Sequence, residues 1–279
     1  MYDRSPQEGT WLVNVVSGER RRLGSWYGAA GSGRAALLDP DRGVTTLLDW
    51  SGRVLDEFPT GRTVVTLSPD GRYLAWLESR SERLPSSFVA PVSTVIVFDT
   101  IARHSYRLGE LRVAGLVWAG AGDRLLVLGE SPDGSVAGVW LAEAPWNDAH
   151  PVLTGRFFVD LRVVPDSSAF FITRVLSGSV EDDGVWLVDP ATGDRRRVPI
   201  EPAYRPTSAA VWVLDAESGS PRLRAYQLDT FQPCASALLT EPVLAETWEV
   251  APDGRWIAYW GALSQHVRVE ALPACRVDS

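Results

Sequence analysis

One nine-residue pattern occurs twice in this chain, near the first quarter and again near the C-terminus. Residues 68–76 read SPDGRYLAW, and residues 251–259 read APDGRWIAY. Proline suits the second position of a type I turn, and glycine suits the fourth, where φ is often positive. The residues after the glycine are rich in aromatic and aliphatic side chains, as in a well-buried strand. Two copies of a turn followed by a strand predict a repeat architecture.

Weaker copies of this pattern set the period of the repeat. The glycine of the turn aligns in them with Gly33, Asp123, Ser167 and Ser208. Polar residues that end apolar strands form a second series, made of Asn14, Asp49, Asp99, Glu143, Asp189, Asp229 and Glu270. The two series interleave with a period of about 40 to 50 residues, which accommodates four short strands and is typical of a β-propeller blade.

We therefore predict an all-β chain that folds as a β-propeller of four-stranded blades, with residues 1–279 forming one domain. The expected blades cover residues 25–58, 62–108, 112–153, 157–198, 203–240 and 244–278. An N-terminal hairpin at residues 10–23 is expected to join the last blade. Six blades fit the six turns; a seventh would require the hairpin to form a minimal blade alone, or an upstream pair of strands missing from this chain.

The repeated unit resembles that of TolB-type propellers, which also builds the propeller domains of prolyl-oligopeptidase-type peptidases. The resemblance is most complete at residues 68–76 and 251–259, and residues 164–172 keep Pro165 and Asp166. It implies a propeller of six to eight blades, commonly exported in bacteria, that serves as a protein-binding platform or as a gate beside an enzyme domain. In such proteins this turn builds the blade, so the resemblance assigns no catalytic residue.

Composition argues against two classes of partner. The net charge is −8, whereas contacts with nucleic acid phosphates require a basic face. No apolar run approaches the about 20 residues that a membrane helix needs, so we expect no membrane insertion. The N-terminus lacks the apolar region of a secretion signal. We expect a monomer, either cytoplasmic or, if a leader was removed, exported to the cell envelope.

The sequence shows no catalytic constellation. It lacks the G-x-S-x-G elbow of a serine hydrolase, and His104, His150 and His266 do not have metal-ligand spacing. The leading interpretation is a non-catalytic scaffold without a cofactor, which binds a protein or small ligand through loops on one face. Two alternatives stay open. One is a metal-dependent lactonase, other hydrolase or polysaccharide-cleaving lyase built on the propeller, and the other is the propeller portion of a larger peptidase.

The first candidate binding loop covers residues 78–93 and is the longest connection between a second and a third strand. Its candidate residues are the apolar Phe88 and the charged Arg80, Glu82 and Arg83. Loops of this length without regular structure are often functional. The competing interpretation is a loop that folds its own apolar side chains onto the blade.

The second candidate is the acidic triplet Glu181, Asp182 and Asp183, in another loop between a second and a third strand. Carboxylate oxygens are ligands that suit Ca²⁺. Calcium loops place their ligands at alternating positions with a glycine turn, and this triplet does not. A solvated polar loop is therefore the competing interpretation.

The two cysteines, Cys234 and Cys275, each lie five residues after a polar residue of the second series. This spacing predicts equivalent outer positions on neighbouring blades. Because blades diverge outward, we expect their Cα atoms to be farther apart than the roughly 7 Å that a disulfide allows. We predict free or differently paired thiols, whereas a disulfide would indicate an oxidising compartment.

Overall fold

The computed structural model describes residues 10–14, 17, 19–24, 27–63, 65–79, 90–215 and 221–275. All regular structure in these ranges is β-strand, so the all-β prediction is confirmed. The chain divides into two compact units, Met1–Gly155 and Arg156–Ser279. The described residues contain no helix long and apolar enough to cross a membrane.

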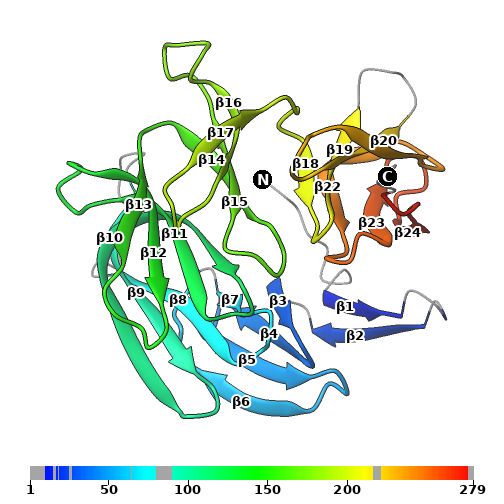
Figure 1. Ribbon diagram of the computed structural model, residues 1–279. Coiled ribbons are helices and arrows are strands. Elements are labelled where there is room, and N and C mark those ends of the chain that lie inside the picture. The colour runs from blue at the N-terminus through cyan, green and yellow to red at the C-terminus, as the bar shows by residue number, and fades with distance from the viewer. Residues whose placement is uncertain are drawn as a thin grey trace. The chain divides into compact units, whose positions relative to one another are not determined.

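The first unit contains a hairpin and two larger antiparallel sheets (Figure 1). The hairpin consists of β1 (Thr10–Val13) and β2 (Arg20–Gly24). A four-stranded sheet follows, with β3 (Tyr27–Gly31), β4 (Arg34–Asp39), β5 (Val44–Asp49) and β6 (Val54–Phe58). The larger sheet contains β7 (Thr66–Leu67), β8 (Tyr73–Ser79), β9 (Val92–Asp99), β10 (His104–Ala119), β11 (Arg124–Glu130), β12 (Ala137–Glu143) and β13 (His150–Thr154).

Strand β10 belongs to two successive blade-like sheets. Its first half pairs with β9 and its second half pairs with β11, and Arg112 takes part in both ladders. The register shifts between Arg107 and Glu110, where Gly109 has a φ of 89°. Such an irregularity bends and twists a strand. The predicted blades at residues 62–108 and 112–153 are therefore joined through β10 into one hydrogen-bonded sheet.

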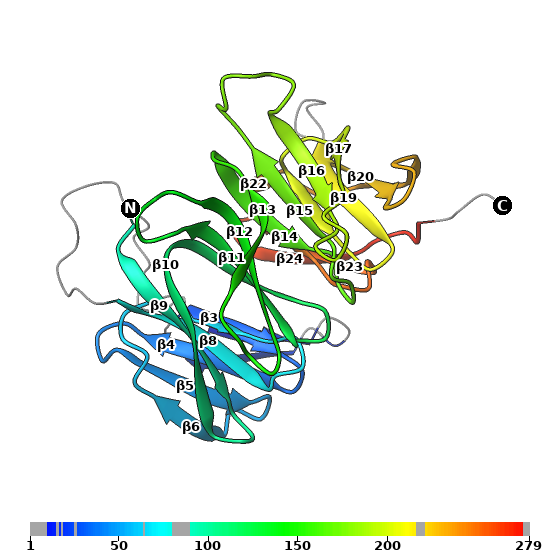
Figure 2. The ribbon, with the colours of Figure 1, turned by 60° about the vertical axis from the view of Figure 1, so that its left-hand side comes forward.

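The second unit contains three sheets whose strands follow chain order (Figure 2). The first has β14 (Phe158–Val163), β15 (Phe170–Arg174), β16 (Gly184–Val188) and β17 (Arg195–Val198). The next has β18 (Tyr204–Pro206), β19 (Ala210–Asp215), β20 (Arg222–Gln227) and β21 (Pro233–Leu238). The last has β22 (Val243–Val250), β23 (Trp256–Gly261) and β24 (Val267–Ala271).

The hydrophobic core lies between neighbouring sheets and between the two halves of the seven-stranded sheet, and second strands contribute most to it. Phe170, Phe171 and Ile172 of β15 are all fully buried. Phe171 packs in one cluster with Tyr204 and Val211 of the following sheet. A strand covered on both faces needs apolar side chains on both, which explains the nearly continuous apolar runs after each turn.

The hairpin β1–β2 forms a two-stranded sheet, and β22–β24 form a three-stranded sheet. The joining of this hairpin to the last blade, the number of blades and the single domain stay predictions.

The repeated turn has the predicted backbone in its two complete copies and at Gly33, where φ is 72°, and it differs in the other weaker copies. Gly71 and Gly254 have φ values of 73° and 71°. In the turn between β14 and β15 the Ser167 N–H donates to the Val164 carbonyl, as the Gly71 N–H does to the Ser68 carbonyl, so Ser167 occupies the glycine position. The positive φ of 59°, however, falls on Asp166. Aspartate tolerates this conformation better than serine, since its side chain can bond to the local backbone.

Two alignments of the turn are corrected. Between β10 and β11 the residues with positive φ are Gly120 and Gly122, at 61° and 111°. The Gly122 N–H donates to the Ala119 carbonyl, so Gly122 and not Asp123 occupies the glycine position. Between β18 and β19 the Thr207 N–H donates to the Ala210 carbonyl, which leaves a shorter turn with Ser208 inside it. The repeat conserves the reversal of the chain, whereas the length of the turn varies.

Neighbouring sheets are connected through these turns. The Ser32 N–H donates to the Pro69 carbonyl at 2.6 Å, within the first unit. The Ser208 N–H donates to the Pro252 carbonyl at 3.0 Å, within the second. The proline of each complete copy therefore accepts a hydrogen bond from the first turn of the preceding sheet.

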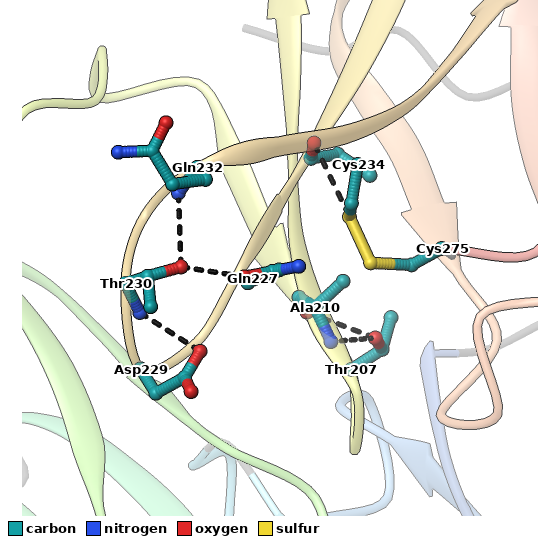
Figure 3. Close-up of a disulfide and its surroundings, with 9 residues drawn as sticks. Thr207, Ala210, Gln227, Asp229, Thr230, Gln232, Cys234 and Cys275 are labelled. Carbon is teal, nitrogen blue, oxygen red and sulfur yellow. Dashed lines mark hydrogen bonds between the residues drawn. A yellow bond between two sulfur atoms is a disulfide. The ribbon is translucent and has the colours of Figure 1, made fainter. Parts of the chain in front are cut away.

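The prediction of free or differently paired thiols is wrong, because Cys234 and Cys275 form a disulfide with a Cα–Cα distance of 4.9 Å (Figure 3). Cys234 lies in β21, the outer strand of its sheet. Among the described residues the last sheet has three strands, and Cys275 lies in the segment that follows β24. The two positions are not equivalent, so the outward divergence of blades does not separate them.

Candidate functional site

The antiparallel order gives each sheet two distinct ends. One end carries the loops between second and third strands and the links to the next sheet, and we call it the loop end. In the described part of the second unit, every large apolar side chain that is exposed lies at the loop end. These residues are Phe157, Val159, Leu176, Val180, Leu238, Leu244, Leu263 and Val267. Isolated exposed apolar residues are ordinary, but their restriction to one end of a unit indicates an interaction surface.

The most exposed of these side chains lie on the loop between β15 and β16, residues 175–183. This loop projects beyond its sheet (Figures 1 and 2). Leu176 and Val180 are 82% and 84% exposed on it. Phe157 is close to the base of the loop, because its carbonyl accepts the Val175 N–H at 3.0 Å. We call Phe157, Val159, Leu176 and Val180 the apolar loop patch.

The acidic triplet supports this loop. The Asp183 carboxylate accepts the Ser177 N–H at 3.0 Å, and hydrogen bonding to Ser177 holds the pKa of Asp183 below its usual value. The Asp182 carboxylate forms an ion pair with Arg174 at 3.4 Å, and the Asp182 carbonyl accepts the Trp186 indole N–H. Two members of the triplet therefore organise the loop, whereas Glu181 is exposed.

The backbone of the apolar loop patch is constrained. Phe157 and Leu176 have φ values of 68° and 54°. Bulky residues rarely adopt this left-handed region, and each such residue costs of order 1–3 kcal/mol. The hydrogen bonds around the loop offset this cost and present two apolar side chains to solvent. Backbone strain of this kind often occurs at functional sites.

The first candidate loop contributes only its base to the described structure. Arg80, Glu82, Arg83 and Phe88 lie outside the described residues. The strands on either side pair as far as Ser79 and Ser93, whose hydroxyl groups are 2.9 Å apart. The interpretation of this loop as a binding site stays a prediction.

The described residues contain no group of three or more His, Cys, Asp or Glu side chains that could hold a metal ion. His104 packs edge-on against Tyr106, and His150 and His266 are exposed on other strands and turns. The structure does not bring the three histidines together in the ladders that it describes. The Ca²⁺ expectation for the acidic triplet therefore gains no support.

A second cluster, which the sequence analysis missed, lies on the first strands of the three sheets in the second unit. It consists of Asp160 and Arg162 on β14, Arg205 on β18 and Glu249 on β22. Arg162 pairs with Asp160 at 3.0 Å and with Glu249 at 3.4 Å. Arg205 pairs with Glu249 at 3.0 Å. One sequence signal could have identified this cluster. The first strands of these three sheets contain charged residues, whereas β3 and β7, which are first strands in the first unit, contain none.

The first unit has a cleft of about 340 Å³ between the hairpin and the end of β5. It is lined by Leu12, Asn14, Glu19, Arg21 and Trp50. The lining combines apolar groups with one acid and one base, so it does not favour one class of ligand.

Comparison with known proteins extends these observations to the fold class. No protein-family model and no curated protein sequence matches the chain. An oligogalacturonate lyase in complex with manganese matches with a TM-score of 0.68 and 15% identity, over 94% of this chain and 82% of the lyase. The β-propeller domain of the trilobed protease from Pyrococcus furiosus matches with a TM-score of 0.58 and 11% identity, over 90% of this chain and 84% of that domain's chain. TolB from Acinetobacter baumannii matches with 0.53 and 15%, over 86% of this chain and 61% of TolB.

These likenesses define the class of protein. The chain has a β-propeller fold, and the resemblance of its repeat to TolB-type propellers is confirmed. Identities of 15% or lower show the fold alone. Function has to be argued from the surface of this chain, because one fold supports many activities.

Proposed function

We propose that this protein is a non-catalytic β-propeller scaffold that binds a protein partner through the loop end of its second unit. The observation that carries the proposal is the gathering of all exposed large apolar side chains of that described unit at this end. Rigid sheets that carry loops at one end are a common arrangement for binding. The constrained backbone of the apolar loop patch supports the proposal, because a preorganised surface loses less entropy on binding.

The chemistry of the patch suggests the kind of partner. Glu181 and Asp182 directly follow Val180 on the loop that also carries Leu176. A complementary partner segment would pack apolar side chains against Leu176 and Val180. It would also place arginine or lysine opposite the carboxylates of Glu181 and Asp182. We therefore expect a partner segment that is both apolar and basic.

The proposal is tested by substituting the exposed tips of the loop. Leu176→Ser with Val180→Ser should preserve the melting temperature, because both side chains already lie in solvent. The matched control is Val54→Ser with Leu55→Ser, which removes two exposed apolar side chains of the first unit. Each tagged protein is incubated with extract from the source cells. A captured protein that is identified by mass spectrometry is then purified for titration against the same variants.

We expect the loop variant to lose at least about tenfold in affinity for the purified partner and the control variant to bind like the parent. Equal affinity of the parent and the loop variant would show that the binding surface lies elsewhere. No specific observation on the described residues favours the metal-dependent enzyme or the peptidase alternative.

A further inference from the structure

The charged cluster on the first strands of the second unit has a ligand-binding geometry that the loop end does not share. Strands β14, β18 and β22 lie in contact in that order. Arg162 and Arg205 approach one carboxylate oxygen, Oε1 of Glu249, from two different strands. Two guanidinium groups that converge on one position are a recurrent way to recognise a carboxylate.

Arg205 has several partners besides Glu249. Its side chain is only 6% exposed, and its guanidinium carbon lies 4.5 Å from the centre of the Trp248 ring. Its Nε donates to the Trp248 carbonyl at 2.9 Å, and its Nη1 donates to the Tyr204 carbonyl at 2.8 Å. Ring stacking and two main-chain carbonyls therefore hold the cation in place, while burial lowers the pKa of Arg205.

Glu249 is the most exposed side chain of the cluster. Its side chain is 66% exposed, whereas those of Arg162 and Asp160 are 27% and 33% exposed. An exposed carboxylate gains little from an ion pair, because solvent screens the attraction and the side chain loses freedom. A buried cation, in contrast, strongly favours an anionic partner. A carboxylate that brings further contacts of its own can therefore replace Glu249.

We propose that Arg162 and Arg205 form a binding site for the carboxylate of an organic acid, and that Glu249 occupies this site in the free protein. Asp160 positions Arg162, since its Oδ2 accepts the Arg162 Nε at 3.0 Å. The carboxylate belongs either to a small organic acid or to the C-terminus of a peptide. Both offer the same two oxygens to the guanidinium groups.

The experiment is a calorimetric titration of the full chain with acetate, succinate and a short peptide that has a free C-terminus, each at millimolar concentration. Glu249→Gln removes the competing charge and keeps the shape of the side chain. We expect this variant to bind at least one of these probes about tenfold more tightly than the parent, because no internal carboxylate competes. Arg162→Gln, introduced alone or together with Glu249→Gln, should abolish this binding.

Arg224→Gln is the matched control, since Arg224 forms an exposed ion pair with Asp215 away from the cluster. It should bind the probes like the parent. The same peptide with an amidated C-terminus should not bind Glu249→Gln. Binding of acetate or succinate alone assigns the site to small acids, and binding of the free peptide alone assigns it to a C-terminus.

Three results would overturn the inference. One is the absence of any gain in probe affinity on Glu249→Gln, and another is equal binding by Arg162→Gln. The third is equal binding of the amidated peptide. A melting temperature of Arg162→Gln close to that of the parent separates lost binding from lost folding. The inference is independent of the loop end, because the loop substitutions Leu176→Ser and Val180→Ser leave these residues in place.

Discussion

The tetrapeptide Ser-Pro-Asp-Gly forms its own turn wherever it occurs in this chain. In the copy that starts at Ser68, the Asp70 carboxylate accepts the Arg72 N–H at 3.0 Å, and the Ser68 hydroxyl accepts the Tyr73 N–H at 2.8 Å. The second copy, at residues 131–134, repeats both bonds, with donors Ser135 and Val136. That copy connects β11 and β12 at the loop end, whereas the first connects β7 and β8 at the opposite end. The motif therefore predicts a turn and does not by itself mark a functional site.

Two turn glycines distinguish the effect of backbone strain on stability from the effect of a steric clash. Gly33 and Gly71 have φ values of 72° and 73°, so alanine is strained at both. A Cβ at Gly33 meets nothing within 4 Å, whereas a Cβ at Gly71 would lie 2.7 Å from the Ser32 carbonyl oxygen. We expect Gly33→Ala to lower the free energy of unfolding by about 1 kcal/mol and Gly71→Ala by about 2–4 kcal/mol.

Urea titration of both variants and the parent measures this difference. Equal losses at the two positions would show that the turn moves freely away from Ser32. A loss only at Gly71 would show that the left-handed backbone itself costs little.

At the scale of single elements, the strands were predictable because each repeat carries local signals. The polar residues that end third strands begin the next turn. Asp49 accepts the backbone N–H groups of Ser51 and Arg53, and Asp99 accepts those of Ile101 and Ala102. Such side-chain bonds to the backbone depend only on nearby residues, so one sequence reveals them.

The candidate sites could not be predicted in the same way. Arg162 and Glu249 are far apart in the sequence and meet only because β14 and β22 flank β18. The exposure of Leu176 and Val180 depends on how the loop of residues 175–183 is held, which apolar side chains in the sequence do not reveal. The disulfide was mispredicted for a related reason. Cys275 lies in the segment after β24, and not at the position that the repeat pattern assigned to it.

The loop between β23 and β24 depends on one carboxylate. Glu241 is only 6% exposed and accepts the Leu263 and Ser264 N–H groups at 2.9 and 2.8 Å. It also accepts the Ser264 hydroxyl and the Arg268 Nε, each at 2.6 Å. Hydrogen bonding to Ser264, followed by Arg268, lowers the pKa of Glu241 from 4.5 to about 2.

This pKa sets an acid dependence of stability with a defined sign. Because the folded state favours the ionised form, Glu241 stabilises the protein above pH 4.5 and loses that effect as the pH falls towards about 2. Glu241→Gln should lower the melting temperature at pH 7 and flatten its decrease between pH 4.5 and pH 2. Melting curves across this range test it, with the exposed Glu201→Gln as the control. An unchanged slope in Glu241→Gln would contradict the assignment.

At the scale of the whole molecule, the disulfide is the one covalent cross-link. It joins β21 to the segment after β24, and both lie within the second unit. The bond ties the segment after β24 to the outer strand of the preceding sheet. Disulfides persist mainly in oxidising compartments, and the compartment of this chain stays a prediction.

Reduction of this bond should destabilise the second unit. The cysteines are 41 residues apart, and closing a loop of that size removes unfolded-state entropy worth about 4 kcal/mol. We expect a reductant to lower the melting temperature of the parent, and hydrogen exchange to increase in β18–β24. The double variant Cys234→Ala with Cys275→Ala should melt at the lower temperature with or without reductant, since it has no bond to break. If the parent melts identically after thiol titration has confirmed complete reduction, then the hydrogen bonds and packing around β24 hold the last sheet without the disulfide.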